Sequence, residues 1–152
     1  MKMELKIPPV VVFFVCLASM FGIYYLLPDF SHDFIYRKTV SRVFLALGAL
    51  AGITGIVAFR QHQTTVDPTN PDKASHLVTT GIYRYTRNPM YVGMLFVLIG
   101  GALRIGNPVC LLSLILYVAY MTRFQIMPEE RALQKQFGPK YKEYQEQVRR
   151  WV

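Results

Sequence analysis

Few residues in this sequence could form a covalent cross-link or bind a metal ion. Only two of the 152 residues are cysteines, Cys16 and Cys110, and both lie inside apolar runs. A cysteine in such a run usually serves as a small hydrophobic residue. Because no cysteine or histidine partner stands at metal-ligand spacing from either one, we predict neither a disulfide nor a metal site.

Charged residues are also scarce, and acidic residues are the scarcer kind. Charged side chains make up 17% of the sequence against 53% for hydrophobic ones, a balance typical of membrane proteins. Nine acidic and 17 basic residues give a formal net charge of +8. In a chain with several long apolar runs, orientation across a bilayer explains these basic residues better than nucleic-acid binding does. We therefore expect the lipid bilayer as a partner and no nucleic acid.

The sequence does contain four apolar blocks of roughly membrane-spanning length. About 20 helical residues cross the hydrocarbon core of a bilayer. The blocks cover approximately residues 8–27, 40–59, 89–104 and 108–127. The first block lacks a small-x-small cleavage site, so we interpret it as a retained span and not as a signal peptide.

These blocks predict an all-α fold. We expect a polytopic membrane helical bundle with about four transmembrane helices and a C-terminal amphipathic helical tail. The whole chain, residues 1–152, should form a single integral membrane domain.

Local signals predict where the later helices begin and end. Asn88 offers a side-chain oxygen as an N-cap, and Pro89 would occupy the first helical position. The tripeptide Gly106-Asn107-Pro108 predicts a tight turn, so the third and fourth spans should form a hairpin. In the tail, residues 128–152, Gly138-Pro139 predicts a break between two short amphipathic helices.

The second span carries two glycines, Gly48 and Gly52, four residues apart. Small residues at this spacing let helix backbones approach closely. Packing inside the chain is one interpretation, and a homodimer through this helix is the other.

Basic residues gather on one side of the predicted bundle. With four spans, the amino terminus, the long polar loop 60–88 and the tail 128–152 share a side, which holds most of the lysines and arginines. The positive-inside rule makes that side cytosolic. We therefore expect an integral protein of the cytoplasmic or inner membrane with both termini in the cytosol.

Two dense polar segments flank the predicted hairpin on that side. They are HLVTTGIYRYTRNPMYVG, residues 76–93, and MPEERALQKQFGPKYKEYQEQVRRW, residues 127–151. Their pattern is Gly and Tyr, then Arg-x-Pro-x-Tyr-x-Gly, the hairpin, Glu-Glu, Leu, Phe-Gly and spaced tyrosines. Over residues 64–151 this order resembles the isoprenylcysteine carboxyl methyltransferase and phospholipid methyltransferase superfamily.

The resemblance implies an integral membrane methyltransferase that uses S-adenosylmethionine and leaves S-adenosylhomocysteine as product. The acceptor would be lipidic or amphipathic, either an isoprenylcysteine-like carboxylate or a phospholipid amine. Carried over by position, the adenosine moiety would meet His76, Leu77, Val78 and Tyr83, and the amino-acid end would meet Glu129. At the helix start, Arg87, Asn88 and Pro89 would favour the cofactor carboxylate.

The catalytic candidates lie at the same membrane face. Glu129 supplies a carboxylate that needs a cationic partner near lipid, and the methionine ammonium would provide one. If the acceptor is an amine, Glu130 or Tyr91 would receive its proton. Prenylcysteine enzymes carry a substrate-side arginine where this chain has Gln125, and Arg123 is the candidate to replace it.

Two other functions remain open at this point. A membrane NADPH-dependent reductase of the sterol reductase type would share part of the architecture and a related tail motif. A non-catalytic membrane packing or lipid-binding protein would leave Asn88 and Pro89 as a plain helix start, and Glu129 and Glu130 as partners of a helix dipole.

Overall fold

The computed structural model describes residues 4–30, 33, 35–61 and 76–152. Residues 62–75, which make up most of the predicted cofactor loop 60–88, lie outside this range. The regular elements are α1 (Pro9–Leu26), η1 (Pro28–Phe30), α2 (Arg37–Gln61), η3 (Gly81–Arg84), α3 (Pro89–Ile105), α4 (Cys110–Tyr120), η4 (Met121–Ile126), α5 (Met127–Phe137) and α6 (Pro139–Gln147). All regular structure in the described ranges is helical, which confirms the predicted fold class.

The helices have the length and composition of a membrane bundle. Three continuous helices, Pro9–Leu26, Arg37–Ala58 and Cys110–Phe137, are long and apolar enough to cross a bilayer. The third predicted span, α3, is an apolar helix of 17 residues. Large apolar side chains such as Phe14, Val15 and Ile53 are 58–63% exposed on α1 and α2, as suits contact with lipid tails.

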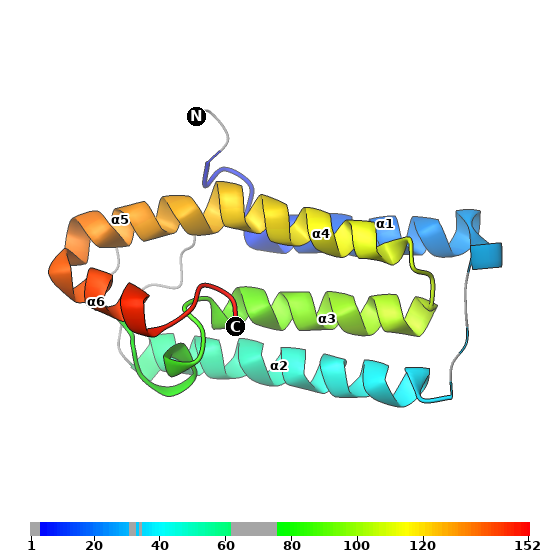
Figure 1. Ribbon diagram of the computed structural model, residues 1–152, viewed down its shortest axis with the longest axis horizontal. Coiled ribbons are helices and arrows are strands. Elements are labelled where there is room, and N and C mark those ends of the chain that lie inside the picture. Colours follow the sequence, from blue (N-terminus) through cyan, green and yellow to red (C-terminus); the bar gives the residue numbers. More distant parts are fainter. Residues whose placement is uncertain (1–3, 31–32, 34, 62–75) are drawn as a thin grey trace.

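Helix α3 lies at the centre of the bundle, between α2 and the pair formed by α1 and α4 (Figure 1). The chain then continues from α4 through η4 into α5, and α6 folds back from the far end of α5 (Figure 1). The segment that follows α6 returns to the start of α3. One end of the bundle therefore collects η3, the start of α3, and the elements from η4 to the tail.

Glycines let α2 and α3 approach closely. A Cβ atom on Gly48 would lie 2.7 Å from the carbonyl oxygen of Gly93, and one on Gly93 would lie 3.0 Å from the nitrogen of Gly52. This face of α2 is therefore covered by α3 of the same chain. The intramolecular interpretation accounts for the two glycines, and a homodimer through Gly48 and Gly52 has no support.

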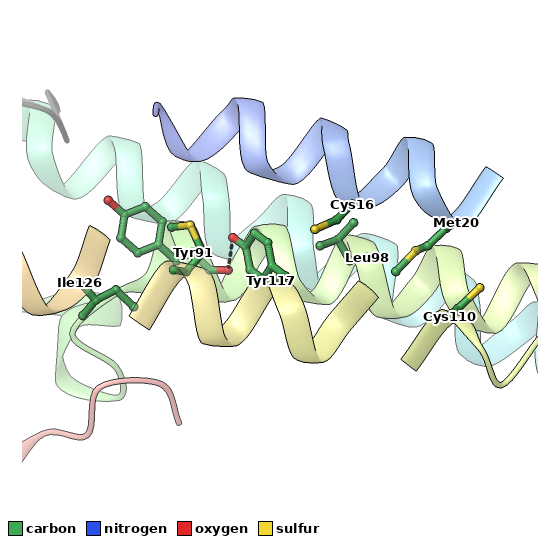
Figure 2. Packing of buried hydrophobic residues seen from close by; sticks show 8 residues of the cluster. Cys16, Met20, Tyr91, Leu98, Cys110, Tyr117 and Ile126 are labelled. Carbon is green, nitrogen blue, oxygen red and sulfur yellow. Dashed lines mark hydrogen bonds between the residues drawn. The ribbon is translucent and has the colours of Figure 1, made fainter. Parts of the chain in front are cut away.

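A buried cluster joins α1, α3 and α4. Met20, Leu98, Tyr117 and Cys110 have at most 1% exposed surface, and the Tyr117 hydroxyl donates to the Tyr91 carbonyl oxygen at 3.3 Å (Figure 2). In a water-soluble protein, burying a large apolar or aromatic side chain stabilises the fold by about 1.5–3 kcal/mol. Between membrane helices, dispersion and close packing provide the stabilisation. The cluster fixes α3 relative to α4.

The predicted helix ends are confirmed at the two turns. Gly106 has φ of 75°, the left-handed conformation that glycine adopts without strain, and Asn107 donates its side-chain N–H to the Leu27 carbonyl at 2.8 Å. Gly138, with φ of 54°, separates α5 from α6. The hairpin turn therefore also holds the end of α1.

The fourth predicted span, residues 108–127, differs from the structure at its end. The helix does not stop at Met127 but passes through the π-helical segment η4 into α5. Pro128 has no N–H to donate to the Phe124 carbonyl, and a wider π turn accommodates such a defect. The Leu5 N–H donates to that carbonyl at 3.1 Å, so the amino-terminal segment satisfies it.

Candidate functional site

The polar groups of the two sequence patterns, Arg-x-Pro-x-Tyr and Glu-Glu, meet at one end of the bundle. The Tyr91 hydroxyl donates to the Glu129 carboxylate at 2.5 Å, across 38 residues of sequence. Gln125 donates its side-chain N–H to the same carboxylate oxygen at 2.5 Å, from one turn earlier on the same helix. Both of these donors are neutral, so within the described part of the chain no hydrogen bond to Glu129 comes from a cation.

Glu130 has the opposite environment. Its carboxylate pairs with Arg87 at 2.7 Å and with Arg150 at 2.6 Å. The side chains of Arg87 and Glu130 are only 10% and 12% exposed. Two adjacent carboxylates thus differ: Glu130 is neutralised by two guanidinium groups, whereas Glu129 faces a tyrosine and an amide.

Arg87 is also bound to backbone. Its guanidinium donates to the carbonyl oxygens of Gln145 at 3.0 Å and Val148 at 2.7 Å. Planar arginine suits such multiple contacts. The Arg87 group predicted to meet a cofactor carboxylate is therefore committed to the tail, and we assign it no direct ligand contact.

The expected N-cap at Asn88 is wrong in its detail. Helix α3 does begin with Pro89 as expected, but the Asn88 side chain makes no cap hydrogen bond. Its amide instead donates to the Arg150 carbonyl at 2.8 Å. The Asn88 side chain is thus oriented by the tail, which returns to this point of the bundle, and no local signal reveals that contact.

Tyr83 is buried against α6. Its carbonyl oxygen accepts the Tyr144 hydroxyl at 2.7 Å, and both tyrosines belong to a buried cluster with Val78 and Tyr141. Burial raises the pKa of Tyr83, and the nearby Tyr144 hydroxyl and Glu129 carboxylate raise it further. Tyr83 is thus a neutral, buried aromatic next to Glu129.

A polar pocket opens beside this cluster. Its volume is about 530 Å³, within the range of about 300–1,000 Å³ that is usual for small-molecule sites. His76, Leu77 and Tyr144 contribute to its wall, and further lining comes from Thr79, Phe137, Lys140, Glu143 and Gln147. The structure therefore places His76 and Leu77 of the predicted adenosine stretch at a pocket, and Val78 in the adjoining tyrosine cluster.

Arg123 lies elsewhere. Its guanidinium pairs with Glu4 at 3.0 Å and stacks on Phe124 at 5.7 Å from the ring centroid. Arg131 pairs with the other oxygen of Glu4 at 2.6 Å. Arg123 thus connects η4 to the amino-terminal segment, and this contact was not anticipated from the sequence.

Other functional candidates were missed by sequence reasoning. Gln125 was considered only as a missing arginine, yet it binds Glu129 directly. Arg150 was considered only as part of a basic tail, yet it binds Glu130. Helical spacing could have revealed Gln125, since residues four apart share a helix face. Nothing local in the sequence points to Arg150.

The arrangement has a definite chemical character. A partly buried carboxylate with neutral donors attracts a cationic group, and the pocket beside the tyrosine cluster lies at the same end of the bundle. In the ranges that the structure describes, no cluster of three or more His, Cys, Asp or Glu residues could hold a metal ion. The fold and the site together define a helical membrane bundle with a polar pocket and two adjacent glutamates at one end.

The sequence family agrees with this class. Residues 36–140 match the family model described as phospholipid methyltransferase. Because the match covers more than half of the chain, the protein belongs to the phospholipid methyltransferase family. The superfamily resemblance predicted from the sequence is confirmed.

Named relatives are similar to this chain over part of their length. Protein-S-isoprenylcysteine O-methyltransferase of Schizosaccharomyces pombe is 34% identical over 125 residues, 80% of this chain and 52% of that protein. The human protein of the same name is 39% identical over 72 residues, 47% of this chain and 25% of its own length. An uncharacterized protein of Haemophilus influenzae is 36% identical over 63 residues, 41% of this chain and all of that protein. The chain thus spans about half, or less, of the methyltransferases it matches.

Proposed function

We propose that this protein is an integral membrane methyltransferase that transfers a methyl group from S-adenosylmethionine to a lipidic or amphipathic acceptor. One observation carries the proposal: Glu129 accepts hydrogen bonds from Tyr91 and Gln125, both neutral, at the end of the bundle that also holds the pocket lined by His76 and Tyr144. A cationic ligand group would complete the pairing of that carboxylate. The cofactor has a cationic ammonium at its amino-acid end.

The residues present fit such a cofactor. His76 and Leu77 would hold the adenosine moiety in the pocket, and Glu129 would hold the ammonium. Tyr83 is buried close to Glu129 and bonded to the pocket residue Tyr144, so it would contact the part of the cofactor in between. Val78 and Pro89 are buried and would support these contacts through packing.

The protein's own contribution is orientation and exclusion of water. When bound, the cofactor supplies a methyl group on a sulfonium, which is already a good leaving group. Holding the acceptor atom about 3 Å from that methyl accounts for most of the required catalysis. Tyr91 and Gln125 would orient Glu129 for this purpose, so the chain needs no covalent step.

The acceptor remains either a carboxylate or a neutral amine. A carboxylate acceptor requires no general base, because opposite charges cancel as the bond forms. An amine acceptor must lose a proton, and Tyr91 is the remaining candidate to relay it. Glu130 is already neutralised by two arginines, which makes it a poor proton acceptor.

Calorimetric titration with S-adenosylhomocysteine tests the proposal. Detergent-solubilised protein should bind it, and Glu129→Ala and Tyr83→Ala should each weaken binding by at least about tenfold. Lys142→Ala, an exposed change on α6, serves as the control and should bind like the wild type.

Three results would overturn parts of this proposal. Thermal stabilisation by NADPH and none by S-adenosylmethionine would favour the reductase alternative. Unchanged affinity in both Glu129→Ala and Tyr83→Ala would remove the site assignment. Binding of neither cofactor would favour a packing or lipid-binding role.

The location follows from the same proposal. The amino-terminal segment, η3 and the tail lie at one end of the bundle, and we place that end in the cytosol because it is rich in basic residues (Figure 1). Cysteine labelling of Thr79→Cys in intact spheroplasts and in inverted vesicles tests this. Labelling from the outside of intact spheroplasts would contradict it.

A further inference from the structure

After α6 the chain continues as an extended segment, residues 148–151, which we call the tail strap. Val148 already has extended backbone angles, φ −124° and ψ 134°. From there the chain runs back to the beginning of α3, where its end lies in Figure 1. The Val148 N–H still donates to the Tyr144 carbonyl at 3.0 Å, and beyond that residue the hydrogen bonds described for the tail strap are tertiary.

Polar contacts join the tail strap to the segment just before α3. The Arg87 N–H donates to the Arg149 carbonyl at 3.0 Å, and the Arg87 guanidinium donates to the Val148 carbonyl at 2.7 Å. The Arg150 carbonyl accepts from Asn88 at 2.8 Å and from the Thr86 hydroxyl at 3.3 Å. Each of these contacts fixes the strap to the start of α3.

Side chains of the tail strap reach two further elements. Arg150 donates to both oxygens of Glu130, at 3.0 and 2.6 Å, and so grips the first turn of α5. Trp151 donates its indole N–H to the Thr122 hydroxyl in η4 at 3.1 Å, and its ring lies 6.5 Å from that of Tyr117 in α4.

The elements joined in this way are those that build the site. The start of α3 carries Tyr91, η4 carries Gln125, and the first turn of α5 carries Glu129. The Tyr91 bond to Glu129 links α3 to α5, and the Arg87 bond to Glu130 links the segment before α3 to α5. The tail strap adds a third connection through Arg150, on the residue next to Glu129.

We propose that the tail strap sets the position of the Glu129 carboxylate, with Arg150 as a positioning residue that acts through Glu130. This inference rests on the proposed function, because its measured effect is cofactor affinity. Misplacing a binding group by about 1 Å can cost about a hundredfold in rate, so a partial loosening should be readily measured. Arg150 itself touches no ligand.

The experiment compares affinities for S-adenosylhomocysteine in the full chain. Arg150→Gln should weaken binding about tenfold, because it removes a charge-assisted, two-point contact. Arg150→Lys keeps the charge without the planar fork, so it should recover part of the loss. Arg149→Gln is the matched control: the neighbouring side chain is exposed, and only its backbone carbonyl contacts Arg87.

A second control separates positioning from general stability. Ser41→Ala removes the buried hydrogen bond from Ser41 to the Gly100 carbonyl, 2.8 Å long, between α2 and α3. It should lower the midpoint of thermal unfolding yet keep the wild-type affinity. If Arg150→Gln does not fold, Trp151→Phe replaces it, and loss of the bond to Thr122 should weaken binding about threefold.

The outcomes are distinct. If the wild type does not bind S-adenosylhomocysteine, the proposed function fails. If the wild type binds but Arg150→Gln and Trp151→Phe match Arg149→Gln, the tail strap has no positioning role. A loss of affinity in Ser41→Ala as large as that in Arg150→Gln would likewise reduce the strap to a structural element.

Discussion

Tyr91 in α3 and Glu129 in α5 form a hydrogen bond of 2.5 Å across the join between the helical hairpin and the tail. The bond gives the Glu129 carboxylate a neutral partner, and the amide of Gln125 gives it another. The same region commits two arginines to Glu130. This division of partners makes Glu129 the carboxylate that we propose for a cationic ligand.

The first prediction concerns that bond. Tyr91→Phe keeps the buried ring but removes the hydroxyl, so Glu129 loses an orienting donor. Affinity for S-adenosylhomocysteine should fall about tenfold, the size expected for a hydrogen bond to a charged group. Tyr117→Phe is the control, because it removes a hydroxyl that donates to the Tyr91 carbonyl at 3.3 Å and not to Glu129. Calorimetric titration of both variants should find the affinity of Tyr117→Phe within about twofold of wild type.

The second prediction concerns the ion pair between Arg87 and Glu130. Arg87→Ala removes one of two cationic partners from a carboxylate that is 12% exposed, and should cost about 3 kcal/mol of stability. Reversible unfolding in mixed micelles measures this loss. Asp33→Asn breaks the ion pair between Asp33 and Arg37. Because the Asp33 side chain is 73% exposed, this change should cost less than about 1 kcal/mol. Equal losses in both variants would contradict the importance of burial.

The third prediction concerns the glycine contact between α2 and α3. Gly93→Ala places a Cβ atom 2.8 Å from the Gly48 carbonyl oxygen, where the backbone must shift. Overpacking of this kind should cost about 2 kcal/mol in the same unfolding assay. Gly22→Ala meets nothing within 4 Å and should be neutral or slightly stabilising, because alanine favours a helix. Full stability of Gly93→Ala would mean that the two helices pack less closely than described.

The fourth prediction concerns alkaline pH. Burial raises the pKa of Tyr144 above its ordinary value of 10, although the nearby Arg87 charge opposes that rise. The folded chain then holds this proton more tightly than the unfolded chain does. The resulting stability is complete below a pH of about 10 and is lost as the pH rises further.

Thermal unfolding measured between about pH 8 and pH 12 tests this effect, because that range brackets the ordinary tyrosine pKa of about 10. Tyr144→Phe should be less stable at pH 8, since the bond to the Tyr83 carbonyl is lost, and should show a shallower decline above a pH of about 10. Tyr85→Phe changes a ring that is 76% exposed and should follow the wild-type curve. A decline of the same slope in Tyr144→Phe would exclude this tyrosine as its cause.

The sequence predicted those features that depend on neighbouring residues. Apolar blocks define the helices because a bilayer demands continuous hydrophobic stretches, and the turn at Gly106 and the break at Gly138 follow from backbone conformations that glycine tolerates. The two polar segments were found in the same way, by their order along the chain. Their meeting at one end of the bundle follows from the hairpin between them.

Partner choice within the site was beyond the sequence. Asn88 was expected to cap α3, but its amide binds the Arg150 carbonyl, 62 residues away. Glu130 was one of two candidates, with Tyr91, to take a proton from an amine acceptor, and it is held by Arg87 and Arg150. The Arg150 carbonyl and the Glu130 carboxylate could each accept from several donors in the sequence. The return of the tail to the start of α3 decides which donors they meet.

The sequence by itself determined an all-helical membrane bundle with polar segments on one side, because hydrophobic length and backbone conformation are local properties. Only the tertiary structure decided which of two adjacent glutamates is neutralised by arginine and which faces a tyrosine and an amide. Hydrogen bonds and ion pairs depend on distances of a few ångströms. Those distances are set by helix packing, by the π-helical segment η4 and by the path of the tail.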